Sequence, residues 1–142
     1  ANGGKRYKVH LLKSVRTDKE GKIVKEQLPE VINEIKLKHE NWKAVMEGMR
    51  SVTEDGTASN VFQNFPIAVG GKTGTAQVPK GSANAVFVAF APYDNPQIAV
   101  AVVVEHGAHG NYIAPIARDI IAAYMGLDKQ IDQDIPTNSL VR

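Results

Sequence analysis

Residues Gly70–Val78, which read GGKTGTAQV, place a lysine and two threonines among glycines and offer the clearest candidate chemistry in the sequence. Gly71-Lys72-Thr73 matches the end of a phosphate-binding loop, whose backbone N–H groups surround the phosphates. That pattern would require another glycine at position 66, where the sequence has Pro66. Because proline has no backbone N–H, and because the lysine lies in a strand-like run, we exclude a nucleotide loop.

Read instead as Lys72-Thr73-Gly74, the same stretch suits the binding of a carboxylate. The ammonium supplies positive potential, and the threonine hydroxyl can donate a hydrogen bond. Gly74 lets the backbone of a strand approach a ligand, and the N–H beyond it can point at a developing oxyanion. Lys-Thr-Gly is one of three motifs shared by serine β-lactamases and penicillin-binding proteins. Alone, the lysine would equally fit an edge strand protected from aggregation.

A much longer pattern surrounds this motif. Six segments follow one another along the chain: ANGG, WKAVMEGMRSVTEDGTA, GGKTGTAQV, FVAFAP, NPQIAVAVVVEHG and APIAR. Together they resemble the C-terminal half of a penicillin-binding transpeptidase domain, most closely class B enzymes of the elongation type, the penicillin-binding protein 2 group. The resemblance assigns residues 1–126 to that domain and leaves residues 127–142 as a polar C-terminal tail.

The resemblance implies an α/β (α+β) fold, in which a five-stranded antiparallel sheet packs with helices. It implies that Lys72, Thr73, Gly74 and Thr75 bind the terminal D-alanine carboxylate of a peptidoglycan stem peptide, or the carboxylate of a β-lactam. The backbone N–H of Thr75 would form half of the oxyanion hole. No metal or organic cofactor is implied. The parent protein would be a D,D-transpeptidase at the outer face of the bacterial cytoplasmic membrane, working with the cell-elongation machinery.

The family's nucleophile, a serine in Ser-x-x-Lys, has no match, because no serine of this sequence has a lysine three positions later. Ser82-Ala83-Asn84 matches the family's Ser-x-Asn motif, but it follows Lys72 instead of preceding it and reads as a turn. We therefore expect a fragment that cannot form an acyl-enzyme alone and whose partner is the missing N-terminal half of the domain. The alternatives are a non-catalytic scaffold module and, less well supported, a serine β-lactamase fragment.

Hydrophobic periodicity predicts the elements that must position the motif. Residues 6–15 and 22–27 should form a β-hairpin around the turn at 17–22, with a connector over 29–40. Further strands are predicted over 67–78, 85–92 and 97–105, and helices over 40–53 and 111–126. The expected apolar stripe of the first helix is Trp42, Val45, Met46, Met49 and Val52. That of the second helix is Ile113, Ile116, Ala117, Ile120, Ile121 and Tyr124, with Pro115 in its first turn and Gly126 as its C-terminal cap.

Composition narrows the function classes further. The 142 residues include no cysteine and carry a formal net charge of +2, which does not suggest a nucleic-acid binder. The longest apolar run, Ile98–Val104, is far shorter than the roughly 20 residues that span a bilayer. His106 and His109 lack matching further ligands, so no metal site is expected. Apolar surface left where the rest of the domain would dock should favour a dimer or strand exchange.

Overall fold

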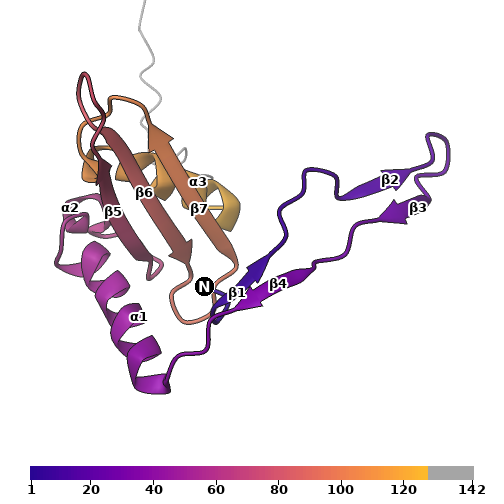
Figure 1. Cartoon of the computed structure of the whole chain (residues 1–142), viewed down its shortest axis with the longest axis horizontal. Coiled ribbons are helices and arrows are strands. Elements are labelled where there is room, and N and C mark those ends of the chain that lie inside the picture. The colour runs from indigo at the N-terminus through magenta and orange to yellow at the C-terminus, as the bar shows by residue number, and fades with distance from the viewer. Residues whose placement is uncertain (128–142) are drawn as a thin grey trace, which may run out of the picture. The chain divides into compact units, whose positions relative to one another are not determined.

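The computed structural model describes residues 1–127, which divide into two units. One unit, called the arm here, is Asn2–Lys38. The other, called the body, consists of Ala1 and the residues from His39 onward (Figure 1). The predicted polar tail lies outside the described residues, apart from Leu127.

A three-stranded antiparallel sheet forms the centre of the body. Its strands are β5 (Gly70–Ala76), β6 (Asn84–Ala91) and β7 (Ile98–Val104), in the order β5-β6-β7. The predicted strands at 67–78, 85–92 and 97–105 are thereby confirmed, with shorter bounds. Since β6 pairs with β5 over residues 84–90 and with β7 over residues 85–91, β5 and β7 are the edges of this sheet within the described residues.

One face of the sheet packs on a helix and forms the core. Figure 1 shows α3 (Ala114–Met125), which follows the 3₁₀ helix η1 (Gly110–Ile113), behind the sheet. The core cluster includes Phe87 of β6 and Ile121 of α3, both with no exposed surface. Burial of a large apolar side chain contributes about 1.5–3 kcal/mol, so this contact fixes the sheet on the helix.

The helix predicted over 111–126 is confirmed as α3, but it begins three residues later than predicted, because residues 110–113 form the 3₁₀ helix η1. Pro115 lies in the first turn, where its missing N–H is not needed, and Gly126 caps the helix with a φ of 72°. The apolar stripe was only partly right. Ile113, Ala117 and Ile121 are buried, whereas the stripe's other three members, Ile116, Ile120 and Tyr124, are exposed. Buried alanines at 114, 117 and 122 bring the helix close to the sheet, so the contact stripe is narrow.

The helix α1 (His39–Glu54) packs against β5 and confirms the helix predicted over 40–53. Its Thr53 is buried, and the Thr53 hydroxyl donates to the carbonyl of Val69, just before β5, at 2.6 Å. Of the predicted stripe on α1, Val45 is exposed and the other members are half-buried. A short helix, α2 (Ser59–Phe62), occupies the segment where the helical pattern breaks.

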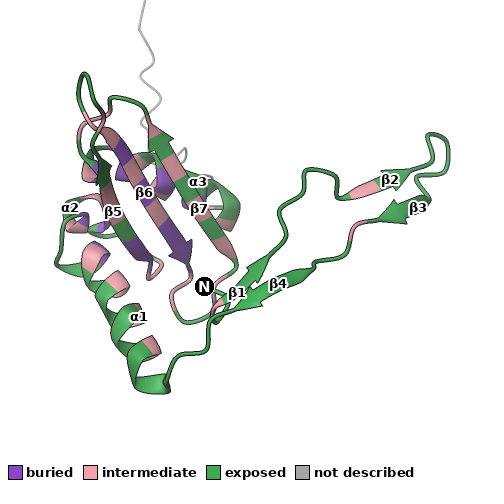
Figure 2. Ribbon diagram, viewed as in Figure 1, coloured by how far each residue is buried: buried purple, intermediate pink, exposed green. Residues whose placement is uncertain are grey.

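The arm consists of two short antiparallel ribbons. Strands β1 (Lys5–Tyr7) and β4 (Val31–Glu34) form one, and β2 (Ser14–Arg16) and β3 (Ile23–Glu26) form the other. The predicted hairpin is confirmed at β2–β3, where the N–H of Lys22 donates to the Thr17 hydroxyl at 3.0 Å. The strand predicted over 6–15 is split between β1 and β2, and the predicted connector contains β4. Figure 2 shows an arm that is almost entirely exposed.

The described residues thus form sheets of two and three strands rather than the single five-stranded sheet that was predicted. The arm strands are only three or four residues long, and the register of each ribbon is irregular. Within residues 1–127, no helix has the length and apolar character needed to cross a membrane.

Candidate functional site

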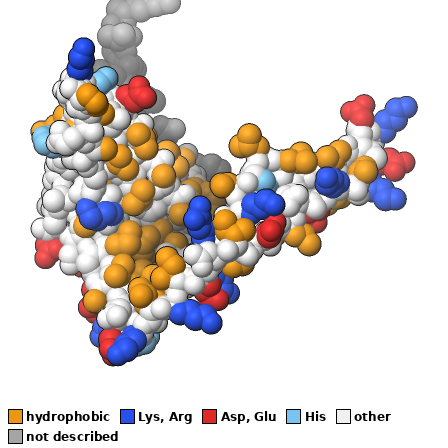
Figure 3. All heavy atoms as spheres, in the orientation of Figure 1, with side chains coloured by type: hydrophobic (Ala, Val, Ile, Leu, Met, Phe, Trp, Pro, Cys, Tyr) orange, Lys and Arg blue, Asp and Glu red, His pale blue; other side chains and the backbone are white. Residues whose placement is uncertain are grey.

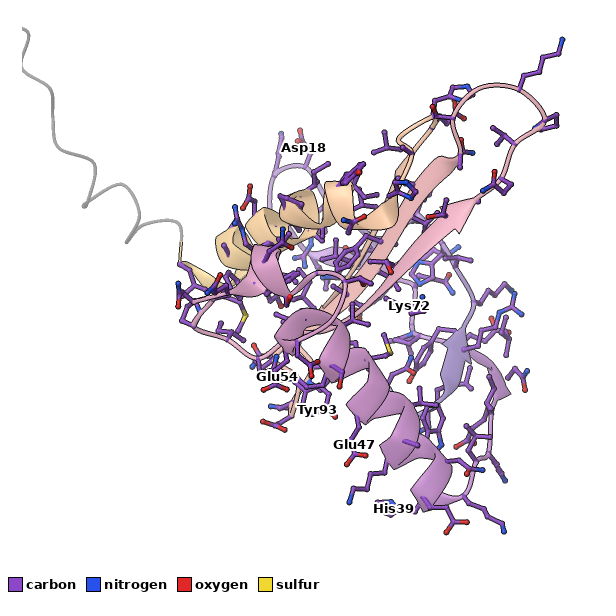
Figure 4. The ribbon with its side chains drawn as sticks, turned by 90° about the vertical axis from the view of Figure 1, so that its left-hand side faces the viewer. Asp18, His39, Glu47, Glu54, Lys72 and Tyr93 are labelled. Atoms are coloured by element: carbon purple, nitrogen blue, oxygen red, sulfur yellow. The ribbon has the colours of Figure 1, made fainter. Side chains whose placement is uncertain are left out.

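Strand β5 presents the Lys-Thr-Gly motif at an edge of the sheet. Side chains alternate along a strand, so Lys72 and Gly74 share one face while Thr73 and Thr75 share the other. Lys72 and Thr75 are exposed, and Thr73 and Gly74 are half-buried. Figure 4 shows Lys72 on the side of the sheet away from α3. All four predicted site residues are therefore contiguous at this edge, with the side chain of Lys72 on one face of the strand and those of the two threonines on the other.

The Lys72 ammonium lies close to the backbone of its own strand. Its Nζ donates to the carbonyl oxygen of Thr73 at 2.5 Å. This places a positive charge beside the strand backbone at Thr73, in an exposed position where an incoming anion can approach it.

A threonine from outside the strand also contacts the motif. Thr57 lies in the loop between α1 and α2, and its Oγ1 is 3.2 Å from Oγ1 of Thr73, a hydrogen bond in which either oxygen can donate. Sequence reasoning missed Thr57, because it lies sixteen positions before Thr73 and only the fold brings the two together. The one available signal was its place in the segment WKAVMEGMRSVTEDGTA, which is part of the family resemblance.

Gly110 packs against the backbone of the motif strand. Gly110 opens η1 and is buried. A methyl group on Gly110 would lie 2.6 Å from the oxygen and 2.8 Å from the nitrogen of Gly74, too close for any real side chain. The oxygen of Val86 in β6 would lie even closer to this methyl group. The backbone of η1 therefore packs directly on the backbones of β5 at Gly74 and β6 at Val86, and this contact helps to hold the motif strand in place.

Ser82-Ala83-Asn84, the match to the second family motif, lies at the end of the β5–β6 connection. The Asn84 side-chain oxygen accepts the N–H of His106 at 3.0 Å, and Nδ1 of His106 donates to the Ser82 carbonyl at 2.9 Å. The N–H of Ala108 donates to the Ala83 carbonyl at 2.9 Å. All three residues thus bind the loop that follows β7, and their contacts are those of a structural connection.

The two histidines considered as metal ligands have other contacts. His106 holds the β5–β6 connection, and the ring of His109 packs edge-on against Tyr112, with centroids 5.4 Å apart. In residues 1–127 there is no group of three or more His, Asp or Glu side chains that could hold a metal ion.

The sheet face opposite α3 carries apolar side chains that the body leaves partly open (Figure 3). Val103 of β7 is 62% exposed, and Ala99 and Ala101 on the same face are exposed as well. Met49 of α1 and Val88 of β6 line a hollow of about 270 Å³ on this face. The face on which Lys72 lies is therefore apolar and only partly covered by the described residues.

A comparison with protein families shows which family the chain belongs to. Residues 1–122 match the model of the penicillin binding protein transpeptidase domain, and the chain belongs to that family.

Individual relatives of the chain are also penicillin-binding proteins or transpeptidases. The chain is similar to penicillin-binding protein 2A of Bacillus subtilis, with 31% identity over 94% of this chain and 21% of the relative. It is 33% identical to the peptidoglycan D,D-transpeptidase MrdA of Escherichia coli, over 64% of this chain and 17% of that enzyme. The solved structure of penicillin-binding protein 2B from Streptococcus pneumoniae superposes with a TM-score of 0.73 at 31% identity, covering 89% of this chain and 23% of that one. The chain spans about a fifth of the length of these relatives.

Proposed function

We propose that this chain is the carboxylate-binding part of a peptidoglycan D,D-transpeptidase that also binds β-lactams. The observation that carries the proposal is the position of Lys72-Thr73-Gly74-Thr75 on an edge strand, with the ammonium and the hydroxyls accessible, in a chain of this family. A free carboxylate is the feature that a D-alanine terminus and a penicillin have in common, and cationic and hydroxyl donors are the groups that bind it.

Each residue has its own role in this proposal. The Lys72 ammonium attracts the carboxylate, and the hydroxyls of Thr73 and Thr75 donate hydrogen bonds to it. The N–H of Thr75 stabilises the oxyanion that develops on the attacked carbonyl, in the manner of an oxyanion hole. Gly74 keeps the strand bare where the ligand lies along it.

The chemical steps require a serine that these 142 residues do not provide in a Ser-x-x-Lys setting. Its oxygen attacks the carbonyl between the two terminal D-alanines, and the terminal D-alanine leaves with a proton on its new amine. An amine of a neighbouring stem peptide then displaces the serine and completes the cross-link. We propose that this serine belongs to another part of the same polypeptide and that the 142-residue chain alone forms no acyl-enzyme.

The uncovered apolar face of the sheet fits this arrangement. Val103 and its exposed neighbours on β7, with Val88 on β6, form a surface that another part of the domain can cover. We propose that the N-terminal part of the transpeptidase domain covers it, at the outer face of the cytoplasmic membrane and in company with the cell-elongation machinery.

The test is the rate at which a fluorescent penicillin labels the complete polypeptide that contains this chain. Lys72→Ala should slow labelling roughly 10- to 150-fold, because a hydrogen bond to a charged group contributes about 1.5–3 kcal/mol. Lys80→Ala is the matched control, since Lys80 is also exposed but lies in the β5–β6 connection, and it should label within about twofold of the parent.

Equal labelling of the Lys72→Ala variant and the parent would refute the proposal that β5 binds the carboxylate of the ligand. A stable covalent label on the 142-residue chain alone would refute the proposal that its nucleophile lies elsewhere.

A further inference from the structure

Thr57 is held in place by its two neighbours in the chain. The N–H of Gly56 donates to the carbonyl of Ser51 in the last turns of α1 at 2.7 Å. The N–H of Ala58 donates to the carbonyl of Val52 at 2.9 Å, and Ala58 itself has no exposed surface. Because both flanking residues are tied to α1 or the core, the Thr57 hydroxyl is presented from a rigid part of the body.

The hydroxyl of Thr57 contacts Thr73, and this contact limits what Thr73 can do. A hydroxyl has one proton to donate and two lone pairs to accept with. If Thr73 donates to Thr57, the Thr73 oxygen turns only lone pairs toward an incoming anion. If Thr57 donates to Thr73, the proton of Thr73 is available to the anion. The 3.2 Å separation permits both directions, so a bound carboxylate selects the second one.

We propose that Thr57 is a positioning residue for carboxylate binding, which donates its proton to Thr73 so that Thr73 can donate to the ligand. This inference rests on the role proposed for Thr73 above. The contact also holds Thr73 in one rotamer at the edge of β5. Two hydroxyls bonded in series polarise each other, which strengthens the outer hydrogen bond.

Three variants of the complete polypeptide test this proposal. Thr57→Val keeps the shape of the side chain and removes the hydroxyl, Thr57→Ser keeps the hydroxyl, and Thr73→Val removes the proposed donor itself. The acylation rate constant is measured for penicillin G and for its carboxylate methyl ester, and the ratio of the two reports recognition of the carboxylate. Thermal melting of each variant provides the folding control, and the exposure of Thr57 predicts little change in it.

Thr57→Val should lower the acid-to-ester ratio about threefold to tenfold, the effect of one net hydrogen bond, and Thr57→Ser should restore it to within about twofold. A loss of rate that is equal for acid and ester would overturn the inference, because it would indicate a general structural role. An unchanged ratio in Thr57→Val beside a lowered ratio in Thr73→Val would overturn the inference and leave the proposed function standing. An unchanged ratio in Thr73→Val would overturn both the inference and the carboxylate role of Thr73.

Discussion

The body of this chain buries a core of apolar side chains, whereas the arm exposes all of its own. In the body, Phe87 and Ile121 have no exposed surface, while in the arm Val9 and Leu11 are 96% and 106% exposed. The arm ribbons are held by backbone hydrogen bonds, such as that from Lys8 to Glu30 at 2.9 Å, with no core beneath them. Isolated two-stranded ribbons are marginally stable in water. The difference explains why the motif lies in the body, since only a packed core can hold donors in fixed positions.

The largest expected effect tests whether the core of the body carries the stability. Phe87→Ala should lower the free energy of unfolding by about 3–5 kcal/mol, because it removes a ring that lies among α3, η1 and the other strands. Urea denaturation followed by circular dichroism measures this change. The matched control is Val103→Ala on the open face of the neighbouring strand, which should cost less than about 1 kcal/mol. Similar losses for the two variants would show that the open face of the sheet is also covered in solution.

An intermediate effect is expected where the body supports the motif. Gly110→Ala places a methyl group against the backbones of Val86 in β6 and Gly74 in β5, so η1 or these strands must shift, at a cost of about 1–3 kcal/mol in the free energy of unfolding. Labelling of the complete polypeptide by fluorescent penicillin should fall at the same time, because Thr75 moves with Gly74. Gly48→Ala is the control: no atom lies within 4 Å of the added methyl group in α1, and alanine should stabilise the helix by about 0.5–1 kcal/mol. Unchanged labelling in Gly110→Ala would show that the packing of η1 does not determine the position of the motif.

The sequence predicted the body better than the arm for the same reason. The strands β6 and β7 are long apolar runs and α1 has a helical period, so local pattern and tertiary packing agree. In the arm, the pattern of residues 6–15 favoured one continuous strand, but without burial nothing enforces it, and the segment forms strands only at its ends. The expected five-stranded sheet combined the two strands predicted within residues 6–27 with the three of the body, a count that the family resemblance also implies. Strand pattern alone does not specify which strands pair, and in the structure the arm strands form separate two-stranded sheets.

Within the site, the sequence predicted what lies in one strand and missed what the fold brings to it. Lys72 through Thr75 are adjacent in the chain, so alternation along the strand was enough to place them. Thr57 and Gly110 also contact the motif, but Thr57 precedes β5 in the sequence and Gly110 follows β7. Their contacts depend on how α1 ends and how η1 begins, which periodicity does not specify.

The smallest effect is expected in the arm. Leu11→Ser replaces a fully exposed side chain, so the free energy of unfolding should change by less than about 0.5 kcal/mol and the mass from light scattering should stay the same. If the apolar side chains of the arm instead hold two copies together, the variant would dissociate at concentrations where the parent is dimeric. A dimeric parent and a monomeric Leu11→Ser variant would therefore show that association buries the arm. The arm and the body would then both have buried apolar side chains, the arm against a second copy and the body in its own core.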